Sequence, residues 1–501
     1  MMLGGVAAAG TAAPVAHTPL GDLVGLSQQG ADAYLGIRFA AAPVGALRWR
    51  APQPVGRWSG RKPAQTFGHS CWQAVSPQGF GPWTHEYVVQ GDISEDCLFL
   101  NVWAPAHAHG KLPVLVWIHG GGFNSGSGTI PIYDGRALAA RGIMVVTINY
   151  RVGVFGFLAH PDLTREAAGG PNANFGLQDM IAALKWVRGN IAAFHGNPDA
   201  VTIAGQSAGA MAVHELIASP LAKGLFARAI GESGLPDQGD APPLAQAEAV
   251  GLAFAKDKGA AAIAELRAMP PEALAASKGS NQVRFVPILD GVVLPSLKPA
   301  SRVPTLLGYT ADEGSALGRD YGSPEPEMLQ RLIADHYSTS AARFAPFYPA
   351  STPDERVESN RQVRRDSGAG DIYAWAMRRG GEPAIYAYQW THTEPGPQSD
   401  RWRAFHSSEI PYVFQTLGAS PERQFTASDW ALSRRISTYW LNFVRSGDLN
   451  GGGLPRWPKF ELASPQILAI GDRIESRPLL PADRMAAMRA FIAGGGQPSI
   501  F

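Results

Sequence analysis

The pentapeptide Gly205-Gln206-Ser207-Ala208-Gly209 limits the possible folds of this chain more than any other segment. It follows an apolar, β-branched run at 200–204 and precedes a stretch whose apolar residues have helical spacing. In a G-x-S-x-G turn the glycines let strand and helix approach closely, and the serine hydroxyl is presented at the end of the strand. The alternative is a serine in an ordinary solvent-exposed turn. The flanking strand and helix favour the first interpretation.

Further along the chain, strand-like and helical segments alternate, which is typical of a parallel sheet with helices on both faces. The expected strands are Leu112–Ile118, Ile143–Asn149, Leu306–Tyr309 and Ala384–Gln389, and the expected helices are Gly135–Arg141 and Leu177–Phe194. The Ala-rich stretch 241–276 is predicted to be a helical insertion. Because no linker interrupts the pattern, residues 19–501 are predicted to form a single α/β domain. Residues 1–18 contain no Asp, Glu, Lys or Arg and are predicted to be a flexible or residual signal-like segment.

A run of three glycines, Gly120-Gly121-Gly122, follows the strand Leu112–Ile118 and His119. Consecutive glycines cost backbone entropy, so their presence indicates that side chains would be in the way. An oxyanion hole has this requirement, because backbone N–H groups must come within hydrogen-bonding distance of a developing alkoxide. A flexible surface loop is the alternative. A phosphate-binding P-loop is excluded, because no Lys-Ser/Thr follows.

A serine nucleophile needs a base, and the base needs an orienting acid. If the order along the chain is serine, acid, histidine, the candidate bases are His214, His336, His392 and His406. His214 comes too early for an acid to lie between. The candidate acids are the adjacent carboxylates Asp312 and Glu313, which follow a predicted strand, and their chemistry alone does not separate them.

Together with several further motifs, these features make the chain resemble the type-B carboxylesterase family, to which the cholinesterases belong. The motifs that carry the resemblance are 34–40 (YLGIRFA), 94–102 (SEDCLFLNV), 149–151 (NYR), 155–158 (FGFL) and 409–414 (EIPYVF). The resemblance implies the α/β-hydrolase fold, with a mostly parallel central sheet and helical insertions, and hydrolysis of carboxylic esters through an acyl-enzyme.

The resemblance also implies roles for single residues. Ser207 would be the nucleophile, Glu313 the acid and His406 the base. The remaining implied positions are an oxyanion hole formed by the amides of Gly121, Gly122 and Ala208, and a serine, Ser233, that supports the acid. No metal or organic cofactor is implied.

The chain has two cysteines, Cys71 and Cys97, on either side of a stretch rich in loop-forming residues. Composition alone leaves free thiols and a disulfide equally open. The resemblance implies that the two are bridged, and a bridge favours a periplasmic or secreted protein over a cytoplasmic one.

One position departs from the family pattern, because Gln206 stands where glutamate is usual. The expected triad is unaffected, but a negative charge beside the nucleophile is missing. We therefore expect a neutral or anionic ester as the substrate.

The charge balance, 43 basic against 42 acidic residues, gives no reason to expect a nucleic-acid partner. No apolar run is long enough to span a membrane. The expected partner is a small-molecule or natural-product ester. A non-catalytic adhesion protein would lack the nucleophile, whereas an amidase, peptidase or lactonase would use the same triad and stays open. The sequence does not determine the oligomeric state.

Overall fold

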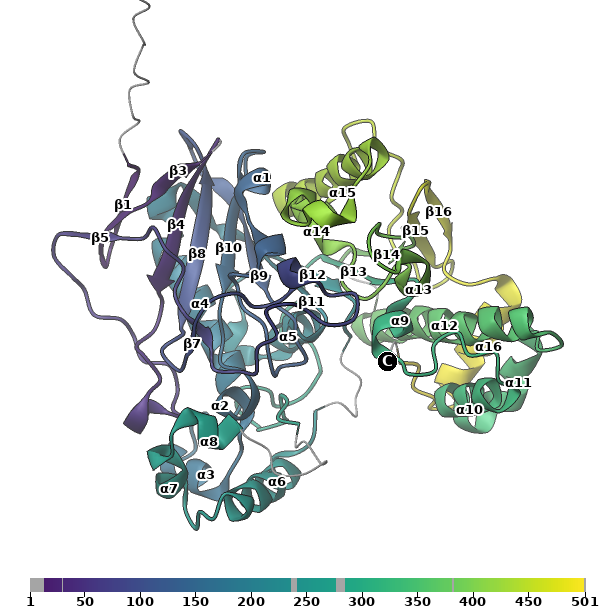
Figure 1. Cartoon of the computed structure of the whole chain (residues 1–501), viewed down its shortest axis with the longest axis horizontal. Helices are drawn as coiled ribbons and strands as arrows, with labels where there is room; N and C mark the ends of the chain where they lie inside the picture. The colour runs from purple at the N-terminus through teal and green to yellow at the C-terminus, as the bar shows by residue number, and fades with distance from the viewer. Residues whose placement is uncertain (1–12, 29, 236–240, 276–283, 381–382, 500–501) are drawn as a thin grey trace, which may run out of the picture.

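The computed structural model describes residues 13–28, 30–235, 241–275, 284–380 and 383–499. A mixed sheet of eleven strands crosses the whole molecule (Figure 1). The strands, in their order across the sheet, are β16 (Ile474–Pro478), β15 (Gln466–Ile470), β14 (Ile385–Trp390), β13 (Thr305–Thr310), β12 (Arg228–Glu232), β11 (Gly196–Gln206), β9 (Leu112–Ile118), β10 (Met144–Ile148), β8 (Phe99–Pro105), β4 (Ala31–Arg38) and β3 (Leu26–Gln28).

Neighbouring strands from β15 to β10 are parallel. The pairs at both edges of the sheet are antiparallel. The predicted α/β-hydrolase sheet, mostly parallel, is therefore confirmed, and each predicted strand is found within one or two residues, except that β11 is longer than the predicted run 200–204.

Sixteen α-helices are found in the described residues. They are α1 (Arg136–Ala139), α2 (Gly153–Phe157), α3 (Pro161–Ala167), α4 (Phe175–Asn190), α5 (Ala208–Ala218), α6 (Leu244–Asp257), α7 (Ile263–Ala268), α8 (Pro271–Ala275), α9 (Glu313–Leu317), α10 (Pro326–Tyr337), α11 (Ala341–Phe344), α12 (Pro353–Arg379), α13 (Ser399–Trp402), α14 (Ile410–Phe414), α15 (Ala427–Ser446) and α16 (Ala482–Ala493). Helices α6, α7 and α8 form the predicted insertion at 241–276, of which residue 276 lies outside the described residues.

Alternation along β9 shows how the two faces of the sheet are covered. Val114 and Val116 belong to one apolar cluster with residues of α4 and α5, whereas Leu115 and Trp117 belong to a second cluster with residues of α14 and α15. Successive side chains of a strand point to opposite faces, so helices cover both faces, as predicted.

The N-terminal segment differs from the prediction. Residues 1–12 lie outside the described residues, but Val15–Thr18 forms β1, which pairs antiparallel with β2 (Gly21–Val24). A third strand, β5 (Arg61–Pro63), pairs with β2. Because β1 obtains backbone hydrogen bonds from β2, the ordered chain begins before the predicted boundary at residue 18.

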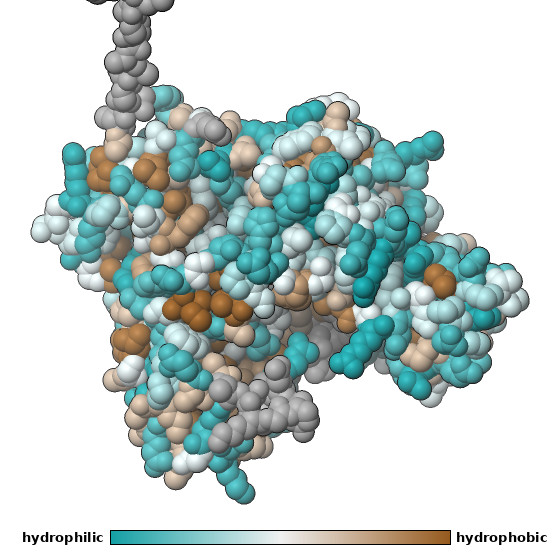
Figure 2. All heavy atoms as spheres, viewed as in Figure 1, coloured by the Kyte–Doolittle hydropathy of each residue, from teal (hydrophilic) through white to brown (hydrophobic). Residues whose placement is uncertain are grey.

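Two groups of helices extend from the sheet (Figure 1). Helices α3, α6, α7 and α8 lie at the lower left, and α10, α11, α12 and α16 lie at the right. The space-filling view of the same face shows a recess between the two groups and a hydrophobic patch left of centre (Figure 2).

Candidate active site

Ser207 lies between the end of β11 and the start of α5. Its backbone has φ 58° and ψ −129°, a conformation that non-glycine residues rarely adopt. Although Ser207 occupies the N-cap position of α5, its side chain makes no capping hydrogen bond. The hydroxyl therefore does not cap the start of α5 and faces a cavity instead.

The two glycines around Ser207 are required by close backbone contacts. A Cβ atom on Gly209 would lie 2.1 Å from the carbonyl oxygen of Ile118 in β9, and one on Gly205 would lie 2.5 Å from the backbone of Gly209. Real Cβ atoms do not approach so closely. The sequence-based reason for these glycines, close packing of strand and helix, is confirmed.

The glycine loop lies directly against the serine. A Cβ atom on Gly120 would be 2.7 Å from the carbonyl oxygen of Gln206 and 3.0 Å from Cβ of Ser207. Gly121 and Gly122 have φ of 106° and 63°, which favour glycine. Ala208 is the first residue of α5, so its N–H has no partner within the helix. All three predicted oxyanion-hole residues line the same cavity as Ser207.

The two adjacent carboxylates have different partners in the structure. Glu313 accepts a hydrogen bond from Nδ1 of His406, and its other oxygen accepts one from the backbone N–H of Thr310 at 2.8 Å. Asp312 instead forms ion pairs with Arg365 and Arg403, each at 3.2 Å. Glu313 is therefore the carboxylate that contacts a candidate base.

The structure also distinguishes the four candidate histidines by their surroundings. Burial lowers the pKa of His214 to about 3 and that of His336 to about 4. His392 pairs with Asp429 and Asp472. Among the four, only His406 lines the cavity of Ser207. A carboxylate on Nδ1 holds the proton there and leaves the lone pair on Nε2, the nitrogen a base uses.

Gln206 makes a contact that the sequence did not predict. Its side chain is buried, and its amide nitrogen lies 3.1 Å from Nε2 of His406. The predicted supporting residue Ser233 is also buried, with φ 54°, but its hydroxyl makes no hydrogen bond within the described part of the chain. Its support of Glu313 stays a prediction.

Two further buried carboxyl groups lie near Glu313. Burial raises the pKa of Glu232 to about 8, and burial with the charges of Glu232 and Glu313 raises the pKa of Glu409 well above its ordinary value. Burial thus favours the neutral form of each of these two carboxyl groups.

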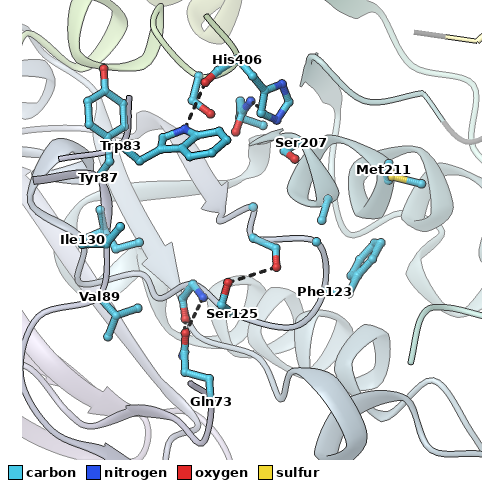
Figure 3. Close-up of a pocket in the computed structure, with 18 of the residues that line it drawn as sticks. Gln73, Trp83, Tyr87, Val89, Phe123, Ser125, Ile130, Ser207, Met211 and His406 are labelled. Carbon is cyan, nitrogen blue, oxygen red and sulfur yellow. Dashed lines mark hydrogen bonds between the residues drawn. The ribbon is translucent and has the colours of Figure 1, made fainter. Parts of the chain in front are cut away.

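The cavity beside Ser207 has a volume of about 840 Å³, within the usual range for small-molecule sites. Figure 3 shows Ser207 next to the ring of His406, with Trp83 and Tyr87 on one side and Phe123 and Met211 on the other. A large share of the remaining wall is apolar and includes Val75, Val89, Ile130, Leu235 and Leu317.

Trp83 belongs to the segment between the two cysteines and contacts the candidate base. Its indole N–H donates to the backbone carbonyl of His406 at 3.2 Å. The indole and imidazole rings are arranged edge to face, with their centroids 6.4 Å apart. The segment itself is closed by a disulfide between Cys71 and Cys97, which confirms the predicted bridge.

Arg423 anchors this segment and was not predicted from the sequence. The guanidinium is buried and donates to the carbonyl of Pro82 at 2.7 Å, to the hydroxyl of Thr84 at 2.8 Å and to the carboxylate of Glu86 at 2.9 Å. An isolated arginine in a segment of mixed composition carries no sequence signal for such a contact.

A metal could be held by one group among the described residues, formed by His85, Glu86 and Glu422. None of the three lines the cavity of Ser207. Glu86 is already engaged by Arg423, so this group is poorly suited to a cation. Within the described residues, no helix combines the length and the apolar character needed to cross a membrane.

Comparison with known proteins gives a consistent result over almost the whole chain. The model of the carboxylesterase family matches residues 12–366 and 367–486. The chain is 36% identical to a fumonisin B1 esterase of Sphingopyxis macrogoltabida, over 92% of this chain and 87% of that protein. It is 34% identical to a para-nitrobenzyl esterase of Bacillus subtilis (strain 168), over 92% and 95% of the two chains.

Solved structures agree. A PNB esterase superposes with a TM-score of 0.79 at 32% identity and covers 95% of this chain and 99% of its own. Sequence, fold and relatives thus converge, and the chain belongs to the carboxylesterase family, the members of which are α/β-hydrolases that cleave carboxylic esters.

Proposed function

We propose that this protein is a serine carboxylesterase that works through an acyl-enzyme on Ser207. The observation that carries the proposal is the hydrogen bond between Glu313 and Nδ1 of His406, in a cavity that Ser207 also lines. It supplies an oriented base next to a hydroxyl that no helix cap engages.

In the proposed reaction, Nε2 of His406 takes the hydroxyl proton as the oxygen of Ser207 attacks the ester carbonyl carbon. Glu313 holds the imidazole and stabilises the imidazolium. The tetrahedral intermediate collapses, the bond to the alcohol breaks, and the alcohol leaves with the proton from His406. Water then attacks the acyl-enzyme with the same proton transfers and releases the carboxylic acid.

The alkoxide that forms in both halves of the reaction needs fixed donors. The amides of Gly121, Gly122 and Ala208 are the proposed donors, since they line the cavity around Ser207. Loss of one such donor typically lowers kcat by about 100- to 1,000-fold.

A fluorophosphonate probe tests the nucleophile directly. After incubation with the probe, peptide mass spectrometry is expected to find one label per chain, on Ser207. Ester turnover should fall in proportion to the fraction of chains that carry the label. A label on another residue, or full labelling with turnover retained, would contradict the proposal.

The proposed substrate is a neutral or anionic ester. Gln206 is uncharged, and a charge about 4 Å away is worth about 4 kcal/mol at an effective dielectric constant of about 20. The described residues that line the cavity also include one arginine, Arg284, and one carboxylate, Glu215. This lining gives no net attraction for a cationic alcohol.

Replacing Gln206 with glutamate is expected to change selectivity. The wild-type protein should show no advantage in kcat/KM for acetylcholine over its uncharged carbon isostere, 3,3-dimethylbutyl acetate. Gln206→Glu should raise the ratio of the two values by tenfold or more, because a carboxylate in the cavity stabilises the bound cation.

Gln206→Met is the matched control, because it removes the contact with His406 without adding a charge. It should leave the ratio of the two kcat/KM values unchanged. A wild-type preference of tenfold or more for acetylcholine would contradict the proposed selectivity.

We further propose that the protein acts outside the cytoplasm, in the periplasm or as a secreted enzyme. The support is the disulfide between Cys71 and Cys97, since such bridges persist in oxidising compartments.

Replacing both cysteines with serine is expected to lower the free energy of unfolding by about 3.5 kcal/mol, from the chain entropy of a 26-residue separation. The freed segment carries Val75, Phe80 and Trp83, which line the cavity. Activity on a bulky ester such as naphthyl butyrate should therefore fall more than activity on phenyl acetate. Thermal unfolding and kcat/KM on both esters measure these effects. Equal losses on both esters would show that the segment does not shape the cavity.

A further inference from the structure

A second cavity, of about 560 Å³, lies at the carboxyl ends of β13 and β14. It shares no lining residue with the cavity of Ser207. Four arginines line it, Arg365 from α12, Arg403 just after α13, Arg477 from β16 and Arg484 from α16. In Figure 1 these elements lie together at the right, and Figure 2 shows strongly hydrophilic side chains over this part of the face.

Two buried aspartates hold three of the guanidinium groups in place. The side chain of Asp312 is 4% exposed and accepts from Nη2 of Arg365 and Nε of Arg403, each at 3.2 Å. That of Asp366 is 1% exposed and accepts from Nη1 of Arg484 at 3.1 Å. Arg365, Arg403 and Arg484 are thus fixed by carboxylates at the wall of the cavity, whereas Arg477 is exposed and has no carboxylate partner within the described residues.

Donor capacity remains after these contacts. A guanidinium has five N–H donors. Within the described part of the chain, no hydrogen bond uses Nη1 or Nη2 of Arg403, or Nε or Nη2 of Arg484. The guanidinium of Arg477 donates, among the described residues, through Nη2 to the side-chain oxygen of Gln389.

The charge of the lining is positive. Four arginines face two aspartates, an excess of two positive charges. Glu358, which pairs with Arg365 at 2.6 Å without lining the cavity, offsets one of them. Positive charge with spare N–H donors in a preformed cavity suits the planar, bidentate recognition of carboxylate and phosphate groups.

We propose that this cavity binds a small oxyanion with two or more negative charges, held by Arg403, Arg477 and Arg484. The assignment does not rest on the proposed esterase mechanism, because none of its residues line the cavity of Ser207. The ligand is defined by its charge and its oxygen acceptors, which polycarboxylates and phosphate share.

Isothermal titration calorimetry of the full chain tests the site. The titrations are made at pH 7 and about 150 mM NaCl, because this salt concentration screens interactions between exposed charges beyond about 8 Å. Citrate and inorganic phosphate are the two probes, and acetate at equal ionic strength is the monovalent control. At least one probe should bind with one site per chain, and acetate should not. Binding by citrate alone would assign polycarboxylates, and binding by phosphate alone would assign phosphate.

Variants locate the binding. Arg477→Gln should weaken it by tenfold or more, and its fold is expected to persist because this side chain is exposed and makes a single hydrogen bond within the described residues. Arg401→Gln is the matched control, since Arg401 is an exposed arginine of α13 outside the cavity. Circular dichroism and ester turnover check both folds. No binding by the wild-type chain, binding unchanged in Arg477→Gln, or an equal loss in Arg401→Gln would each overturn the proposal.

Discussion

Replacing Ser207 with alanine should lower kcat on a p-nitrophenyl ester by about 10⁴- to 10⁶-fold, the range seen when a serine nucleophile is removed. The fold should persist. The side chain of Ser207 makes no capping hydrogen bond, and the alanine would occupy the same backbone conformation. Circular dichroism and thermal unfolding check the fold, and stopped or continuous ester assays measure kcat.

Ser76→Ala is the matched control for this experiment. Ser76 lines the same cavity from the segment between the cysteines, and its replacement should change kcat by less than about threefold, since surface substitutions usually have small effects. A Ser207→Ala protein that retains more than about a hundredth of wild-type turnover would contradict the nucleophile assignment, because the oxyanion hole and binding alone leave far less.

The second large effect is expected from Glu313→Gln. The side-chain amide can place its NH₂ group against Nδ1 of His406, which then favours the proton on Nε2, where no base can act. Loss of the orienting carboxylate in this way lowers kcat by about 10³- to 10⁴-fold. The variant should remain folded, because the change conserves volume.

Asp312→Asn makes the same chemical change one residue earlier. It should lower the thermal unfolding temperature, because Arg365 and Arg403 lose a buried carboxylate partner, but it should lower kcat by less than about tenfold, since Asp312 does not contact His406. If Asp312→Asn loses more turnover than Glu313→Gln, the assignment of the acid is wrong.

These two carboxylates show where sequence-based prediction ends. The strand before them was predictable from its apolar run, whereas helix α9, which begins at Glu313, was not predicted. Asp312 and Glu313 are neighbours at the start of α9, so local pattern cannot tell which one faces a histidine 93 residues after Glu313. That choice is made by tertiary packing, and the family resemblance anticipated it.

The roles of the glycines could be predicted from the sequence more fully than those of the two carboxylates. The glycines at 205 and 209 were predicted to permit close packing, and backbone atoms of β9 and α5 indeed fill the space where their side chains would be. The contact of Gln206 with His406 spans 200 residues and the docking of Arg423 on Glu86 spans 337. Neither has a local signature, because each partner belongs to a segment that is ordinary in composition.

The docking of the disulfide-closed segment onto Arg423 bears on how the protein is made. A ribosome adds roughly 5–20 residues per second, so Arg423 follows Cys97 after on the order of tens of seconds. Until His406 and Arg423 have both been added, the segment that carries Trp83 lacks one or both of these contacts. A nascent chain at this stage is expected to present apolar surface to chaperones, and a chain truncated before residue 406 would lack both contacts of this segment.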